Sequence, residues 1–522
     1  MRVSKITPRA ALALATCLAL TPAAFAAEAT QAEADRLRAL FETYVGRSAP
    51  DKPPVVTVTP KGESYDLVFD AESLLAPVRA LGIELKVGRL TSTIAPLPDG
   101  NWRWTGTSFP EISYGFAGQT GRFAFEGFSG EGVYDPRLET FLSHTMRIAR
   151  AVGEQSVPKK GEDPRFDVRK TDENIELRMT AGPAASGSGI DAVVTQTGGA
   201  VVETFSLSEG LEKGVPDMEM TLKIASSSID ADIRGFKTRE FNALWTHLVA
   251  HHDKEDFTTR QGALKARISA LLPLFERMRQ KVVFKGFEVE TPFGFGSMSE
   301  LVYGLDTTGV TRDGAAELTI GFKGFQMHSL FLPAWAAKLV PTDFDLKGRV
   351  SGYDLATSGA AYLESADFAA EKPLSPEAEA RIATLLLPRS NVEIVLDGNR
   401  VRAPLYELAL DGRMTAGPAG AKGAVTVTAT GLDAAIAALS DPKAGAEGKK
   451  AAEELRGMIS LAEKKNGALV WRIDFENDAV SVNGRPLGAV DGESDEEEEG
   501  IVEPKNGKKG EDGGKKGKDK KL

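Results

Sequence analysis

The sequence lacks the residues that several common classes of enzyme and binding protein require. Cys17 is the only cysteine in 522 residues, which excludes a disulfide framework and a thiolate metal cluster. The motifs HExxH, CxxC and GxSxG and the phosphate-binding P-loop are absent, so no familiar catalytic centre can be assigned. Positive charge is in deficit, with 63 Lys and Arg against 74 Asp and Glu, and this argues against a general nucleic-acid binder.

Long apolar runs are also missing, and the one short run lies at the amino terminus. A basic start is followed there by apolar residues 10–20 and by small residues at positions −3 and −1 of a cleavage site, Ala24 and Ala26. The run is shorter than the ~20 residues that span a bilayer. We therefore expect a removable signal peptide over residues 1–26, rather than an anchor, and a periplasmic or secreted mature chain without a transmembrane segment.

Apolar residues make up 42% of the chain, enough for a large core, and most of them alternate with polar ones as in β-strands. The clearest strand places Leu469, Trp471, Ile473 and Phe475 on one face. Shorter segments have helical spacing, at residues 34–45, 241–249, 375–387 and 449–464. The predicted fold class is α+β: an elongated, mainly antiparallel, sheet-rich body with short amphipathic helices packed on it.

Two further segments also have helical spacing. Apolar residues between Leu138 and Val152 follow Asp135-Pro136, a sequence typical of a helix start. A second predicted helix covers residues 264–278, with a kink at Pro273 and a basic outer face formed by Arg260, Lys265, Arg267, Arg277, Arg279 and Lys281. A basic amphipathic helix can lie on an anionic membrane, but such charges are more often a solvated face.

A short pattern of apolar residue, charged residue, Gly and Phe occurs four times, around Gly127, Gly235, Gly286 and Gly324. Looser versions occur at Gly352-Tyr353 and Gly431-Leu432. We interpret the pattern as a strand that stops at a glycine with positive φ, followed by an apolar residue under a helix. The alternative is chance repetition in a chain rich in Gly and Phe.

Composition divides the chain into five regions. Residues 1–26 are the signal peptide, and sheet-rich regions are predicted at 27–156, at 165–372 with two long helices, and at 373–490. The break at 157–164 contains two prolines, a glycine and four charges. Residues 491–503 hold eight acids and residues 505–521 hold eight lysines, so 491–522 is predicted to be a disordered charged tail.

Histidine provides the only cluster of potential metal ligands. His247 and His251 are spaced i and i+4, so both project from one face of the predicted helix, with Glu240 on the same side. His252 follows directly. No third ligand is evident, and helix-end histidines that interact with the C-terminal dipole are the competing interpretation. No catalytic or cofactor-binding residue can be assigned.

Several of these segments resemble a known family. The first helix, the segment Val55-Val56-Thr57-Val58-Thr59-Pro60, the segment Trp102-Arg103-Trp104 and the strand-Gly-apolar-helix units are similar to a secreted alphaproteobacterial family, domain of unknown function 2125. More distantly, Gly431-Leu432-Asp433 before a helix resembles AsmA-like envelope proteins. That likeness implies long sheets with grooves that take part in lipid traffic. Neither resemblance implies catalytic residues.

Three functions are compatible with the sequence. The first is a non-enzymatic periplasmic protein of the cell envelope, a sheet-rich scaffold or binding protein for a lipid or another apolar ligand or envelope component. The second is an exported hydrolase with an unrecognised site. The third is a metal-binding protein that uses His247 and His251. An uncovered apolar face would favour the first, and converging carboxylates with shifted pKa values would favour the second.

Overall fold

The computed structural model describes residues 28–48, 51–80, 82–161, 164–208, 217–251, 259–477 and 479–487. The predicted signal peptide, the predicted charged tail at 491–522 and His252 lie outside these residues. The described chain, up to Leu487, forms one compact unit. Among its helices, none is long and apolar enough to cross a membrane.

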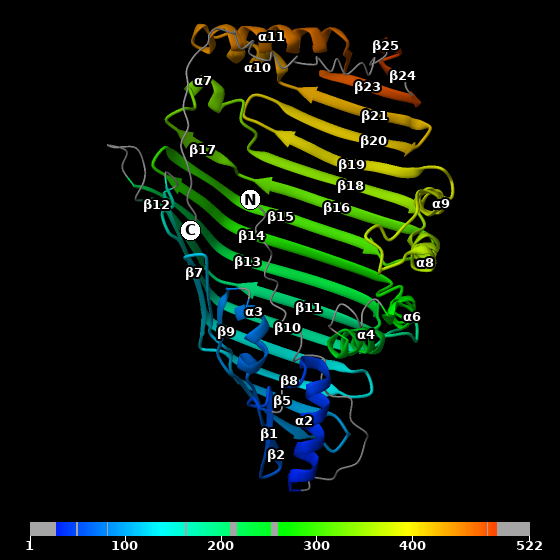
Figure 1. The fold of residues 1–522 in the computed structure, drawn as a ribbon. Coiled ribbons are helices and arrows are strands. Elements are labelled where there is room, and N and C mark those ends of the chain that lie inside the picture. Colours follow the sequence, from blue (N-terminus) through cyan, green and yellow to red (C-terminus); the bar gives the residue numbers. More distant parts are fainter. Residues whose placement is uncertain are drawn as a thin grey trace, which may run out of the picture. The chain divides into compact units, whose positions relative to one another are not determined.

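One continuous antiparallel sheet organises this unit, and its 25 described strands confirm the sheet-dominated α+β class (Figure 1). Short strands begin the chain: β1 (Val56–Lys61), β2 (Ser64–Phe69), β3 (Glu84–Val87), β4 (Leu90–Pro96), β5 (Trp102–Ser108), β6 (Ile112–Phe116), β7 (Gln119–Glu126) and β8 (Ser129–Asp135). The central strands are β9 (Thr140–Val157), β10 (Arg165–Pro183), β11 (Ile190–Gly198), β12 (Val201–Ser208), β13 (Met218–Phe236), β14 (Arg277–Thr291) and β15 (Gly294–Thr308). The last are β16 (Gly314–Lys323), β17 (Gln326–Ser329), β18 (Asp343–Tyr353), β19 (Val392–Arg402), β20 (Glu407–Gly417), β21 (Gly420–Thr430), β22 (Glu463–Lys465), β23 (Ala468–Asn477), β24 (Ala479–Val482) and β25 (Arg485–Leu487).

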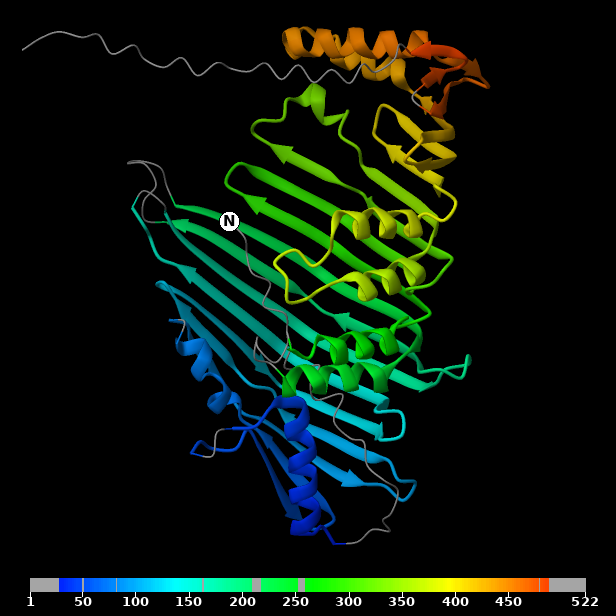
Figure 2. The same ribbon diagram turned by 45° about the vertical axis from the view of Figure 1, so that its right-hand side comes forward.

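Helices lie between strands rather than in a separate layer. Single helices are α2 (Gln31–Val45), α3 (Ala76–Ala80) and α7 (Ala334–Ala337), with 3-10 turns η2 (Ala71–Leu74) and η3 (Pro442–Ala444). The other helices form three pairs between strands: α4 (Thr238–Ala250) with α6 (Gln261–Leu271), α8 (Leu355–Ser365) with α9 (Pro376–Leu386), and α10 (Leu432–Leu439) with α11 (Gly445–Ser460). The first two pairs connect strands that are hydrogen bonded to each other, β13 to β14 and β18 to β19. In Figures 1 and 2 the first two pairs follow one margin of the sheet, which we call the helix margin.

Strands that follow each other in sequence mostly pair with each other. From β13 to β16 the chain runs back and forth, then continues through β18, β19, β20, β21 and β23. The predicted region boundaries at 157–164 and at 372 both fall inside this sheet. Strand β9 pairs with β10 across the first boundary, and β18 pairs with β19 across the second.

The helix predicted between Leu138 and Val152 is wrong, because this segment forms most of β9. Its apolar residues fit both periods, since Met146 and Ile148 also alternate with the polar residues Thr145 and Arg147. Strand β9 pairs with β10 over nearly its whole length, and these backbone hydrogen bonds decide between the two patterns.

The helix predicted over residues 264–278 is correct only in its first part. Helix α6 ends at Leu271, before Pro273, whose ring lacks the backbone N–H that a helix interior needs. Arg277, Arg279 and Lys281 lie on β14, and therefore no continuous basic helix face exists. The predicted first helix and the helices at 241–249 and 375–387 are confirmed as α2, α4 and α9, and the 449–464 prediction overlaps α11.

The four copies of the Gly-Phe pattern all have the expected positive φ, but only one precedes a helix. Gly235 leads from β13 into α4, as Gly352 and Gly431 lead into α8 and α10. The predicted strand-turn-helix unit is wrong for the other three copies. Gly286 lies inside β14, and Gly127 and Gly324 join strands that continue each other along a common neighbour.

These three glycines lie on one line across the sheet, which we call the crease. Gly127, Asn174, Gly286 and Gly324 all have φ between 52° and 62°. Asn174 is on β10 and Gly286 is on β14, and the turn between β11 and β12 and strand β13 lie between them. The strands between them carry small residues on this line, Ala149, Ala225 and Ser299. A residue in the left-handed region interrupts the alternation of side chains along a strand, so the crease divides the sheet into two parts.

The best-packed core lies at the amino-terminal end, where α2 covers the first strands. Leu37 is fully buried, and Phe41 packs with Trp102, Trp104 and Tyr134 in the same cluster. Trp245 from α4 joins this cluster and donates from Nε1 to the Tyr44 carbonyl oxygen at 2.9 Å. Helices α2 and α4 are therefore held together over one end of the sheet.

We predict that Gly286→Ala destabilises the protein by about 2 kcal/mol, because positive φ is unfavourable for alanine and the added Cβ would lie 2.7 Å from the Ala225 Cβ. Gly182→Ala in β10 is the control, since an added Cβ there meets no atom within 4 Å. Urea unfolding of both variants measures the difference. Equal stability of the two variants would contradict a structural crease.

A second prediction concerns acid stability. His144 lies between the Trp104 and Phe141 rings, at 5.2 and 4.9 Å between centroids, and burial lowers its pKa below the ordinary value. On acidification the His144 imidazole is therefore protonated at a higher pH in the unfolded chain than in the folded protein. The free energy of unfolding falls as the pH drops below about 6.5. We expect His144→Phe to reduce the loss of unfolding free energy between about pH 7 and about pH 5. An unchanged pH slope would contradict the prediction.

Candidate functional site

The candidate site is one face of the sheet on the helix side of the crease. Residues that pair directly in an antiparallel sheet point to the same side, so the registers define this face strand by strand. One row crosses eight strands, and all of its members are apolar: Phe284, Leu301, Phe322, Phe344, Val401, Leu408, Ala429 and Leu469. A second row contains Ile229, Val282, Tyr303, Ile320 and Leu346. We call the side that carries these rows the apolar face.

The opposite side of the same strands is charged, and we call it the polar face. Asp232, Arg279, Asp306, Glu317 and Arg349 are paired in one row across five strands. Ion pairs connect many of its side chains, such as Arg279 with Asp306 at 2.9 Å and Lys347 with Glu317 at 3.4 Å. Arg277 and Arg279 hold the pKa of Asp306 below its usual value despite partial burial. The polar face is thus suited to contact with water.

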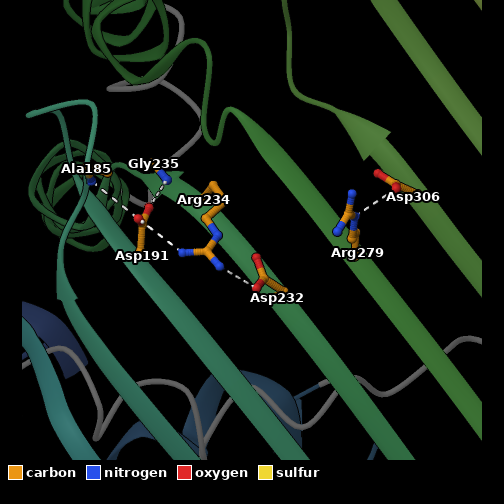
Figure 3. A network of polar contacts seen from close by, with 7 residues as sticks. All are labelled: Ala185, Asp191, Asp232, Arg234, Gly235, Arg279 and Asp306. Atoms are coloured by element: carbon orange, nitrogen blue, oxygen red, sulfur yellow. Dashed lines mark hydrogen bonds and ion pairs between the residues drawn. The ribbon is translucent and has the colours of Figure 1, made fainter.

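Figure 3 shows how the polar face meets the turn at Gly235. Asp191 accepts hydrogen bonds from the backbone amides of Gly235 at 3.0 Å and Ala185 at 3.3 Å. Arg234 donates to Asp191 at 3.3 Å and to Asp232 at 2.6 Å. Burial raises the pKa of Asp191, but the two amides and Arg234 outweigh this effect and lower the pKa overall. This network holds the end of β13 where the chain enters α4.

The apolar face has little cover. From β13 to β20, no large apolar side chain on a described strand is buried, and Tyr303 and Leu318 are 40% and 37% exposed. Under α2, in contrast, Val56 is 2% exposed and Tyr134 is fully buried. A half-exposed antiparallel sheet normally buries its apolar side against another layer. The described chain provides such a layer only at the ends of this sheet.

Helices border the apolar face on several sides. Helices α2 and α4 cover one end, as described above. At the other end Trp471, which shares its side with the apolar rows, donates from Nε1 to the Met458 carbonyl oxygen of α11 at 2.8 Å. Helices α6, α8 and α9 follow the helix margin in both ribbon views. Between these helices, the part of the chain that the structure describes forms no layer over the central strands.

Two hollows in the described structure are lined largely by charged and polar side chains. One of about 490 Å³ lies on the polar face around Asp306, and one of about 810 Å³ lies beyond the crease among paired charges such as Arg169 and Glu154. Every described carboxyl group with a clear pKa shift is shifted downward. In each case an ion-pair or hydrogen-bond partner favours the charged form of the carboxyl group.

The histidine candidates are brought together at the end of α4. The His247 and His251 rings lie 4.6 Å apart, and the His251 amide donates to the His247 carbonyl oxygen. Among the described residues, no group of three or more His, Cys, Asp or Glu side chains could hold a metal ion. Burial, Arg267 and the neighbouring His251 lower the pKa of His247. This positive surrounding also disfavours a bound cation.

The apolar face cannot be located from single segments of the sequence. The strand with Leu469 and Trp471 was identified, and it belongs to the apolar face. Phe284 and Phe322, by contrast, are distinguished in the sequence only as parts of the Gly-Phe pattern. Alternation of apolar and polar residues in each strand was the available indication, but the register that aligns the strands is absent from any single segment.

No family model, curated protein or solved structure matches this chain. The interpretation of the apolar face therefore depends on its own geometry.

We predict that the purified protein retains no stoichiometric zinc after dialysis, because two helix-end histidines supply only half of a tetrahedral site. Elemental analysis of the wild-type protein and of the His247→Ala variant measures this directly. One zinc per chain that is lost in the variant would contradict the prediction.

Proposed function

We propose that this is a non-enzymatic protein of the cell envelope that binds lipid acyl chains along its apolar face. The observation that carries the proposal is the unbroken apolar row across eight strands, opposite a charged and ion-paired side. Apolar surface of this extent is costly in water, at about 25 cal/mol per Å². Soluble proteins rarely expose such a patch unless it serves an interaction.

The dimensions of the face suit an extended chain molecule. Eight strands at about 4.8 Å spacing give a width of about 34 Å. Residues 277–285 of β14 extend about 30 Å from the helix margin to the crease, at about 3.3 Å per residue. The hydrocarbon core of a bilayer, which contains two opposed acyl layers, is also ~30 Å thick. A single acyl chain therefore fits on the face in either direction, and each methylene removed from water contributes about 0.8 kcal/mol.

The predicted export supports lipid as the ligand, because the envelope makes lipids the most available apolar molecules. The competing scaffold function would cover the apolar face with a second sheet, from another copy of this chain or a partner protein. The hydrolase alternative has no supporting observation, since the shifted carboxyl groups are all ion-paired or hydrogen bonded in their charged forms. The metal-binding alternative has no third ligand among the described residues.

The proposal predicts that protein exported with its own signal peptide, and purified without detergent, carries phospholipid or a related acyl compound. Leu318→Glu places a charge on the apolar face and should lower the bound lipid several-fold, because burying a carboxylate under an acyl chain is costly. Val193→Glu is the matched control. Val193 is 43% exposed and Leu318 is 37% exposed, but Val193 shares its side with Asp232 on the polar face.

Mass spectrometry of organic extracts gives the lipid content of the three proteins. The proposal expects lipid in the wild-type protein and in Val193→Glu, and much less in Leu318→Glu. Lipid no higher than in a control protein of similar size would contradict it, as would equal amounts in both variants. Dimerisation that Leu318→Glu abolishes, in the absence of lipid, would support the scaffold function instead.

A further inference from the structure

A group of exposed apolar side chains lies at the margin opposite the helix margin. Strands β14 and β15 meet there in a hairpin at Phe293, and the segment after β17 lies beside it. Leu330 is 83% exposed and Phe331 is 76% exposed, the two highest values among the large apolar side chains of the described structure. Phe293 and Met327 are 46% and 38% exposed. We call these four residues the apolar tip.

The segments that form the apolar tip are almost without charge. Residues 291–299 and 324–342 contain one charged residue in 28 positions, Lys338, and no acid. In the whole chain 26% of the residues are charged, so about seven charged residues would be expected in 28 positions. The acid that precedes the hairpin, Glu290, is ion-paired with Lys223 at 2.8 Å. The tip therefore combines apolar side chains with a weakly positive surrounding in an otherwise acidic protein.

Hydrogen bonds hold the apolar tip in a defined conformation. The Leu330 amide donates to the Phe293 carbonyl oxygen at 3.0 Å, which joins the two segments. The Phe331 amide donates to Ser329 Oγ at 3.2 Å, and the Phe293 amide donates to Thr291 Oγ1 at 3.2 Å. The Phe293 and Phe331 rings lie 5.8 Å apart. The backbone polar groups are thus partly satisfied within the loops, as entry into an apolar medium requires.

We propose that the apolar tip inserts into the interfacial region of a lipid bilayer and docks the protein on a membrane surface. Leucine and phenylalanine side chains enter the boundary between headgroups and acyl chains, and aromatic residues are typical of this region. Trp335, four residues after Phe331, is partly exposed with its Nε1 buried, so its indole serves as a fluorescent reporter rather than as an anchor. Lys338 is exposed and supplies a positive charge that lipid phosphate groups attract.

A bilayer fits the apolar tip better than a protein partner does. Two loops present four apolar side chains, whereas a stable protein interface buries about 800 Å² on each partner and surrounds its apolar centre with a polar rim. The tip has no charged rim for specific pairing, since Lys338 is the one charge in its segments. A bilayer requires no such pairing and accommodates a small protruding group.

The apolar tip lies next to the apolar face. Phe322 stacks on Phe344 at 5.6 Å within the long apolar row and contacts Phe325 at 5.8 Å. Phe325 begins the segment that leads to the tip, directly after Gly324 of the crease. Membrane docking does not require that the apolar face binds lipid, because the exposed loops are a separate observation.

The test is flotation of the full-length exported protein with vesicles of phosphatidylethanolamine and phosphatidylglycerol. We expect Leu330→Asp/Phe331→Asp to lower the vesicle partition coefficient about 100-fold, roughly tenfold for each apolar side chain removed. The matched control is Tyr362→Asp/Met458→Asp, which changes two exposed apolar residues on helices α8 and α11, 39% and 54% exposed. It should bind vesicles as the wild-type protein does.

Quenching by lipids with brominated acyl chains locates the contact. Fluorescence should fall on vesicle binding, and the Trp335→Phe variant should bind equally without this fall. No binding by the wild-type protein, equal binding by both double variants, or quenching that persists in Trp335→Phe would overturn the proposal. Loss of vesicle binding alone would leave lipid in the organic extract unaffected, so failure of the docking proposal is distinguishable from failure of the proposed function.

Discussion

Backbone hydrogen bonding within one continuous antiparallel sheet is the interaction on which the rest of this structure depends. Each strand from β13 to β23 finds its partners in its neighbours, so the body can extend without a second layer of sheet. The polar face can then be solvated and ion-paired, while the described residues form no layer over the apolar face of the central strands. The functional proposal follows from this arrangement, because an apolar side that the protein does not cover is expected to bind an external partner.

The crease forms the border of the apolar face on the side opposite the helix margin. Left-handed residues at Gly127, Asn174, Gly286 and Gly324 interrupt the alternation of side chains, and small residues opposite them leave room for the kinked backbone. On one side of this line the helix pairs occupy the strand ends. On the other side the hairpin of β14 and β15 carries the apolar tip. The apolar face therefore lies between the helix margin and the margin that carries the apolar tip.

Local features of the fold were predictable from sequence, and non-local ones were not. Helices α2, α4 and α9 and the strand at Leu469 follow from period and turn residues within single segments. The segment from Leu138 to Val152 satisfied two periods at once, and only its pairing with β10 made it a strand. The same limitation applies to the site, since alternation indicated an apolar side in each strand but not the register that joins Phe284 to Leu469. The glycine pattern was correctly assigned positive φ, but its position inside the sheet depends on neighbours far away in sequence.

Neighbouring residues on β16 allow the most direct test of lipid binding. Ile320 belongs to the apolar face and Thr319 to the polar face, so a photoreactive amino acid at either position samples opposite sides of one strand. Irradiation of cells that export each variant, followed by mass spectrometry of the purified protein, identifies what contacts each side. The account predicts a lipid adduct at position 320 and none at position 319. Equal lipid adducts at both positions, or a protein adduct alone at position 320, would contradict it.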